Sequence, residues 1–141
     1  MATYNITVTP STTSGGWTYS GDSTDGSVGS TTSPISEAST INFTLAADAV
    51  TAGWSWLTGS SSTSGKGNTA FFVTPNANSN FTWADPGSSA KLVVSDADND
   101  PGQSGSTSQS HSYTLYANLT TGTPPTTTKY DSDPQIINKR G

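Results

Sequence analysis

The chain has 141 residues, of which only 11% are Asp, Glu, Lys or Arg, for a net charge of −5; a typical soluble domain carries about 25% charged residues. A nucleic-acid partner is not expected, because such proteins cluster Lys and Arg to displace counterions from phosphates, and the four lysines here are scattered. Membrane insertion is not expected either, since no apolar run approaches the ~20 residues of a spanning helix.

Hydrophobic residues make up only 30% of the chain, but its 4 Trp, 5 Tyr and 4 Phe favour a folded domain over disorder. The absence of cysteine excludes disulfides and thiolate metal sites and leaves the redox compartment open. Strand-like alternation begins almost directly after Met1, without the basic start and apolar centre of a signal peptide. We therefore expect a protein of the cytoplasm, of a particle or inclusion, or one exported without a Sec signal.

Alternation of apolar and polar residues predicts short strands along the whole chain. Near the N-terminus, Tyr4, Ile6 and Val8 alternate with polar residues, and Pro10 ends the run. Loops rich in Gly, Ser, Thr and Asp separate the later strands, and residues 46–50 offer only a short helical turn. The expected strands are residues 4–9, 17–19, 41–45, 53–59, 69–74, 81–83, 91–94, 113–119 and 135–138.

The last third of the chain is expected to organise the sheets. Tyr113, Leu115 and Ala117 sit two apart between polar residues, in a proline-free run long enough for a central strand. The chain then returns through residues 121–129 to a short apolar strand at residues 135–138. This C-terminal strand is expected to complete a sheet.

The spacing of these strands indicates the fold class. Strands recur about every ten to fifteen residues, with turn residues between them and no amphipathic helix. We predict an all-β single domain, residues 1–141, built as an immunoglobulin-like antiparallel β-sandwich of about seven or more strands. A β-barrel is the alternative.

A set of short motifs resembles a known family. The motifs are residues 92–99 (Leu-Val-Val-Ser-Asp-Ala-Asp-Asn), 113–116 (Tyr-Thr-Leu-Tyr) and 133–138 (Asp-Pro-Gln-Ile-Ile-Asn). They resemble the small bacterial DP-EP proteins and, more distantly, inclusion-body proteins of the AidA/PixA type. The resemblance implies an immunoglobulin-like sandwich and carries over no catalytic residue. It covers little of residues 1–40, and the Ser/Gly insertions depart from the compact pattern of the family.

Asp96, Asp98 and Asp100 occupy positions one, three and five of a possible calcium-binding loop. Pro101 stands where a Gly normally allows the sharp turn, and Thr107 stands where a bidentate Glu closes the ligand shell. The favoured interpretation is a solvated turn in which Asp side chains bind the local backbone. Calcium is the alternative, and no other cofactor is expected.

Trp54 and Trp56 fall on one face of a predicted strand, where they could form a flat platform for stacking sugars. The competing interpretation places both in the core, because tryptophan burial dominates β-sandwich cores and this chain is short of aliphatic residues. The core is favoured. A carbohydrate-binding module that uses exposed aromatic residues stays open as the alternative function.

The sequence contains no recognisable catalytic constellation. His111 is the one histidine and cysteine is absent, which excludes Cys/His chemistry and leaves any Ser/His/Asp triad dependent on a single residue. No Gly-x-Ser-x-Gly motif occurs. His111 is expected at the surface, at the start of a strand. We predict a protein that is not an enzyme.

The low charge points to self-association. Few charges give weak repulsion between copies, and surfaces rich in Ser, Thr, Asn and Gly lose little free energy when they pack on copies of themselves. Strand edges with few lysines can pair with a neighbour, and residues 4–9 and 135–138 are the expected edge strands. We predict a structural homo-oligomer: a bacterial or phage assembly, inclusion, filament or capsid-decorating subunit. The residues expected at the contact are Asp133, Pro134, Ile136 and Ile137.

Overall fold

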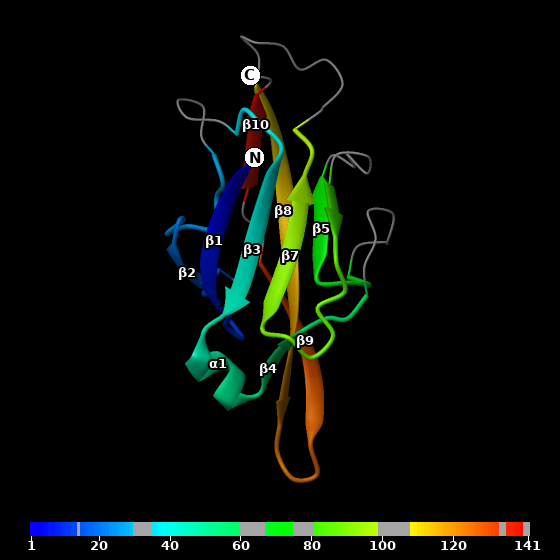
Figure 1. Ribbon diagram of the computed structural model, residues 1–141. Coiled ribbons are helices and arrows are strands. Elements are labelled where there is room, and N and C mark those ends of the chain that lie inside the picture. Colours follow the sequence, from blue (N-terminus) through cyan, green and yellow to red (C-terminus); the bar gives the residue numbers. More distant parts are fainter. Residues whose placement is uncertain are drawn as a thin grey trace.

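The structure is a computed structural model that describes residues 1–13, 15–29, 35–59, 67–74, 81–98, 108–132 and 135–139. Within these residues, ten strands and one short helix build two sheets that share one hydrophobic core (Figure 1). The predicted all-β sandwich is therefore confirmed. The helix, α1 (Ala47–Ala52), links the two sheets and is as short as the sequence suggested.

The first sheet has the strand order β2-β1-β3-β7-β6. Its β1–β3 pair is parallel, in contrast to the antiparallel order predicted, and its other pairs are antiparallel. The parallel pair requires the chain to cross over between β2 and β3 instead of turning back in a hairpin. The strands are β1 (Ala2–Thr9), β2 (Thr18–Gly21), β3 (Ser39–Leu45), β6 (Phe81–Trp83) and β7 (Lys91–Asp96).

The prediction that residues 4–9 form an edge strand is wrong. β3 covers one side of β1 along nearly its whole length, and β2 covers the second half of the other side. Gly15 adopts a φ of 75°, in the left-handed region that glycine tolerates, and helps the chain fold back as β2. On the half of β1 that β2 does not cover, the Asn5 N–H donates to the Asp22 carboxylate over 2.6 Å. Part of the backbone on this side therefore also has a hydrogen-bond partner.

The second sheet is organised by β8 (Ser108–Thr121), the long central strand that the sequence predicted. β4 (Trp54–Trp56) and β5 (Phe71–Thr74) pair with one side of β8. β9 (Thr126–Ser132) and β10 (Gln135–Lys139) pair with the other side, end to end and in one continuous register (Figure 1). The C-terminal strand thus completes this sheet, as predicted.

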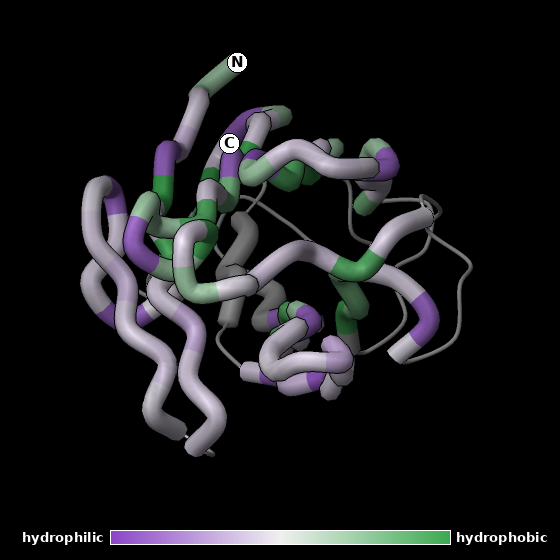
Figure 2. The backbone as a smooth tube through the Cα atoms, turned by 90° about the horizontal axis from the view of Figure 1, so that it is seen from below, coloured by the Kyte–Doolittle hydropathy of each residue, from purple (hydrophilic) through white to green (hydrophobic). Residues whose placement is uncertain are grey.

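Aromatic rings fill the core between the sheets. Phe71 lies 5.2 Å from Trp83, 6.1 Å from Phe81 and 5.5 Å from Tyr113, measured between ring centroids. Phe43 of the first sheet also contacts Tyr113, at 5.4 Å. Figure 2 shows how short the hydrophobic segments are among long pale and purple polar stretches. Large rings therefore supply the buried area that a chain short of aliphatic residues lacks.

Tyr113 joins this core to a loop of the N-terminal half. Its hydroxyl donates a hydrogen bond to the carbonyl of Gly26. Burial raises the pKa of Tyr113 well above the ordinary value of 10.0, because the ionised phenolate would be desolvated there.

This raised pKa predicts alkaline sensitivity. A group whose pKa is higher in the folded state stabilises the fold fully below its unfolded pKa, and that stabilisation is lost as the pH rises toward the folded pKa. Above pH 10 the free energy of unfolding should fall by up to about 1.4 kcal/mol per pH unit for this proton. Tyr113→Phe should cost about 1 kcal/mol at neutral pH, because Gly26 loses a donor, and should make the alkaline fall shallower. Urea unfolding between pH 8 and 11 measures both effects; equal alkaline slopes in the two proteins would contradict this role.

Candidate functional site

The outer edge of β9 is the most distinctive exposed feature of the sandwich. β9 pairs with β8 alone, and among the described residues no strand covers its other side. Five of its seven residues are exposed, and Tyr130 and Ser132 are half-buried. The β8–β9 hairpin also projects beyond both sheets (Figure 1). We call the uncovered side of Thr126–Ser132 the β9 edge.

Local chemistry explains why this polar segment forms a strand. Its run of β-branched threonines suits an extended backbone, and Gly122 supplies the φ of 90° that the hairpin turn needs. The hydroxyls of Thr120 and Thr127 lie 2.7 Å apart and link the two strands near the turn. The hairpin is thus held by backbone pairing and hydroxyl contacts more than by burial.

Backbone hydrogen bonds of β8 show which side of the strand each peptide group faces. The Tyr116 N–H donates to the Ala70 carbonyl, and the Tyr116 carbonyl accepts from the Leu57 N–H. The Thr120 N–H donates to the Gly53 carbonyl. Even-numbered residues of β8 therefore direct their peptide groups toward β4 and β5, and odd-numbered residues direct theirs toward β9 and β10.

The same alternation fixes the outward groups of β9. Ala117 lies opposite Tyr130, so Tyr130 directs its peptide groups toward β8. The neighbouring residues Thr127, Lys129 and Asp131 consequently direct their N–H and C=O groups away from β8. These are the groups that the β9 edge offers to an added strand.

Charge on the β9 edge is concentrated in Lys129 and Asp131, both exposed. The Lys129 ammonium donates to the Gly67 carbonyl over 3.1 Å and lies 5.7 Å from the centre of the Tyr116 ring. These contacts hold it over the outer face of the sheet, the face that Asp131 shares. Within the described part of the chain the one ion pair joins the N-terminal amine to Glu37, so neither Lys129 nor Asp131 is neutralised there.

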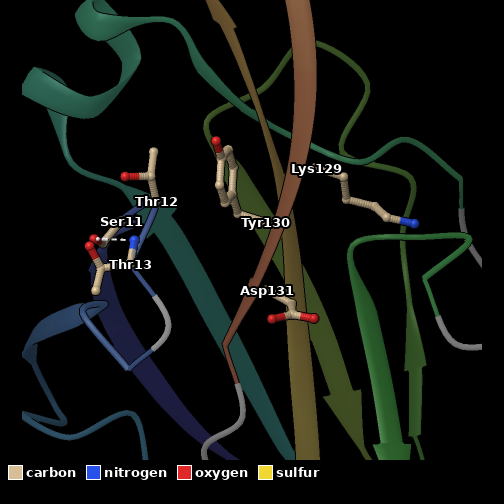
Figure 3. Close-up of a pocket in the computed structure, with 6 residues that line it drawn as sticks. All are labelled: Ser11, Thr12, Thr13, Lys129, Tyr130 and Asp131. Carbon is tan, nitrogen blue, oxygen red and sulfur yellow. Dashed lines mark hydrogen bonds between the residues drawn. The ribbon is translucent and has the colours of Figure 1, made fainter.

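A pocket of about 160 Å³ lies beside this edge, between the turn at Ser11, Thr12 and Thr13 and residues 129–131. Tyr130 points toward this turn, whereas Lys129 extends away from it (Figure 3). Hydroxyl groups, one carboxylate and one aromatic ring line the pocket. This is a set of donors and acceptors without a metal-binding cluster or a nucleophile–base pair.

The floor behind the pocket is aromatic. Tyr130 contacts Trp54 with ring centroids 5.4 Å apart, and Trp54 contacts Trp17 at 6.3 Å. The Tyr19 hydroxyl forms a hydrogen bond with the Ser132 hydroxyl, which ties β2 to the end of β9. β9 is therefore anchored on its inner face and open along its edge.

The sugar platform considered for Trp54 and Trp56 is wrong. Trp54 is 8% and Trp56 2% exposed, so neither offers a ring face to solvent. The Trp56 indole N–H donates to the Ala90 carbonyl over 2.8 Å, which satisfies its polar atom inside the core. The favoured core interpretation is confirmed.

The acidic loop is placed in part. Asp96 ends β7 and is buried, and its carboxylate accepts the Asp98 N–H over 2.9 Å. Asp98 has a φ of 50°, a conformation that Asp tolerates better than most residues. The Asp96 side chain thus binds the local backbone, as the sequence favoured, but the expectation of a solvated turn is wrong at Asp96 and Asp98, because both are buried. Asp100 lies outside the described residues, and no group of three metal-binding side chains occurs within them; the calcium alternative stays a prediction.

The expected surface position of His111 is wrong. β8 begins at Ser108, so His111 lies inside the strand and on its core face, where it is 3% exposed. Its ring contacts Phe81 edge-on, with centroids 5.1 Å apart.

Of the residues predicted to mediate assembly, Ile136 and Ile137 lie in β10, which pairs with β8 and with no other strand that the structure describes. Asp133 and Pro134 lie outside the described residues. The sequence prediction missed β9, because residues 126–132 lack apolar alternation; the run of β-branched threonines after a Gly/Pro turn was the available signal.

Comparison with known protein families and with curated protein sequences finds no match to this chain. Over the residues that the structure describes, no helix has the length and apolar character needed to cross a bilayer.

The core position of Trp56 predicts a large stability effect. Trp56→Ala should lower the free energy of unfolding by about 3–5 kcal/mol, because it empties a buried site. Val50→Ala on α1, where the side chain is 45% exposed, should change it by less than about 0.5 kcal/mol. Chemical denaturation measures both, and a fully stable Trp56→Ala protein would contradict the core assignment.

Proposed function

We propose that this protein is a non-enzymatic structural subunit that self-associates by adding strands to the open side of the β8 sheet. The observation that carries the proposal is the β9 edge, a strand exposed along its outer side and directing N–H and C=O groups outward. Such edges are templates for pairing with another chain. Natural proteins usually shorten, cover or charge them.

The surface favours contact between copies. With 11% charged residues and a net charge of −5, long-range repulsion between copies is weak. A lysine on an edge strand usually discourages pairing with another chain. In β9 the single lysine stands two residues from an aspartate, whose opposite charge offsets this effect. Threonine-rich strands lose little free energy on pairing, since a partner's peptide groups replace water at the outward N–H and C=O groups.

On the side of β8 that pairs with β9, β10 continues the register, so the available edge comprises Thr126–Ser132 and Gln135–Lys139 among the described residues. The contact residues named from sequence (Asp133, Pro134, Ile136 and Ile137) belong to this edge in the proposal. The resemblance to DP-EP and AidA/PixA-type proteins fits an assembly, inclusion, filament or capsid-decorating role and remains part of the proposal.

A proline in the edge tests the proposal. Thr127→Pro removes an outward N–H without removing a β8–β9 hydrogen bond, so it should weaken self-association by about tenfold or more while the subunit stays folded. Thr127→Val is the matched control, because it keeps the N–H and equally loses the hydroxyl contact with Thr120. Sedimentation velocity over a range of concentrations measures the effect. A wild-type chain that stays monomeric throughout would refute the proposal.

A second function, carbohydrate binding, is favoured by one observation: the pocket beside Tyr130 combines an aromatic ring, hydroxyls and the Asp131 carboxylate, groups that suit a polyol ligand. Because Tyr130 packs on Trp54, an occupied pocket should change tryptophan fluorescence. Titration with soluble mono- and oligosaccharides should give saturable changes that Asp131→Asn weakens and Asp48→Asn, on α1, leaves intact. The absence of any saturable change would exclude this alternative.

A further inference from the structure

We infer that two copies of this chain pair through their β9 strands, antiparallel and about a two-fold axis at Tyr130, with Lys129 of each copy opposite the partner's Asp131. This inference rests on the proposed self-association and specifies its partner, register and symmetry. It follows from the direction of the backbone groups and from the position of two charges.

Backbone geometry first limits the possible registers. In an antiparallel pair, residues that exchange hydrogen bonds must both direct their peptide groups toward the other strand. On β9 these are Thr127, Lys129 and Asp131, the odd-numbered positions. A two-fold axis must therefore pass through a residue position and not between two residues, because an axis between residues would pair outward groups with inward ones.

Charge then selects among the allowed registers. An axis at Lys129 places the two Lys129 side chains opposite each other, and an axis at Asp131 does the same for the two Asp131 side chains. Like charges on directly opposed residues destabilise strand pairing. An axis at Thr128 leaves both charges opposite uncharged residues. An axis at Tyr130 places Lys129 opposite the partner's Asp131 and repeats that pair by symmetry. Only this last register, among the four centred on residues 128–131, makes both charged pairs complementary.

The contacts of the single subunit support this register. Lys129 is already held on the outer face by the Gly67 carbonyl and the Tyr116 ring, on the same face as Asp131. Lys129 and Asp131 stand two residues apart in β9 and therefore share one face of the strand, so both pairs would form on that face of the joined sheet. The side chain at position 130 would face its symmetry copy on the other side, beside the pocket.

The predicted assembly is closed. The same strand is used by both copies, so the contact is isologous and does not propagate by itself. The β8 sheets of the two subunits would become one continuous sheet, and any larger assembly would require a second surface.

Charge reversal tests the register. K129D and D131K each convert two attractive pairs into two repulsive ones, and each should weaken dimerisation by about 10- to 100-fold. The double variant K129D/D131K exchanges the charges and should restore dimerisation to within about threefold of wild type. An equimolar mixture of the two single variants should form heterodimers, because both pairs are then complementary.

The controls separate failure of the register from failure of the proposed function. D48K on α1 reverses an exposed charge outside the β9 strand and should dimerise like wild type. Circular dichroism and thermal unfolding check that each variant folds. A monomeric wild-type chain would overturn both the function and the inference. Association that the single reversals leave unchanged, or that the double variant does not restore, would overturn the register and leave the function standing.

Crosslinking supplies an independent measurement. The chain contains no cysteine, so Y130C would place one thiol on the axis, where paired Cα atoms lie about 4.5 Å apart and can form a disulfide. The T127C control would place the two thiols about 20 Å apart along the strands and should remain unlinked. Linked dimers of T127C, or none of Y130C while the protein still associates, would contradict the register.

Discussion

The structure depends on which strands pair with the backbone N–H and C=O groups of β8. This 14-residue strand is too long for any one neighbour, and its hydrogen-bonding groups are divided among four shorter strands. β4 and β5 cover one side, where the even-numbered residues bond. β9 and β10 cover the other and thereby become the outer edge of the sheet. The exposed edge is thus a consequence of the way in which the central strand is paired.

β9 is anchored on its inner face and uncovered along its outer side. The inner face of β9 rests on Trp54 through Tyr130 and on β2 through the Tyr19–Ser132 hydrogen bond. Its outer side carries only threonine hydroxyls, peptide groups and two opposite charges. An anchored but uncovered strand loses little conformational entropy when it pairs, because its backbone is already fixed by β8. That is the physical reason for assigning the assembly role to β9 and not to a loop.

Sequence patterns predicted the parts of the fold that burial controls. The alternation at Tyr113, Leu115 and Ala117 identified the central strand, and the shortage of aliphatic residues correctly placed Trp56 in the core. The sequence patterns did not predict the features of the fold that depend on strand pairing and not on burial. β9 has no apolar alternation and was expected as a connecting segment, and residues 4–9 were expected at an edge because sequence alone does not reveal that β2 folds back over β1. The charges of Lys129 and Asp131 can be related to a pairing register only once the direction of the β9 peptide groups is known.

Amide hydrogen exchange at β9, followed by NMR in dilute and concentrated solution, tests the central claim most directly. The N–H groups of Thr128, Tyr130 and Ser132 face β8 and should be protected at both concentrations. Those of Thr127, Lys129 and Asp131 face outward and should exchange rapidly when dilute and become protected when concentrated. If the outward amides exchange equally fast at every concentration while the molecules associate, β9 is not the contact and the account is contradicted.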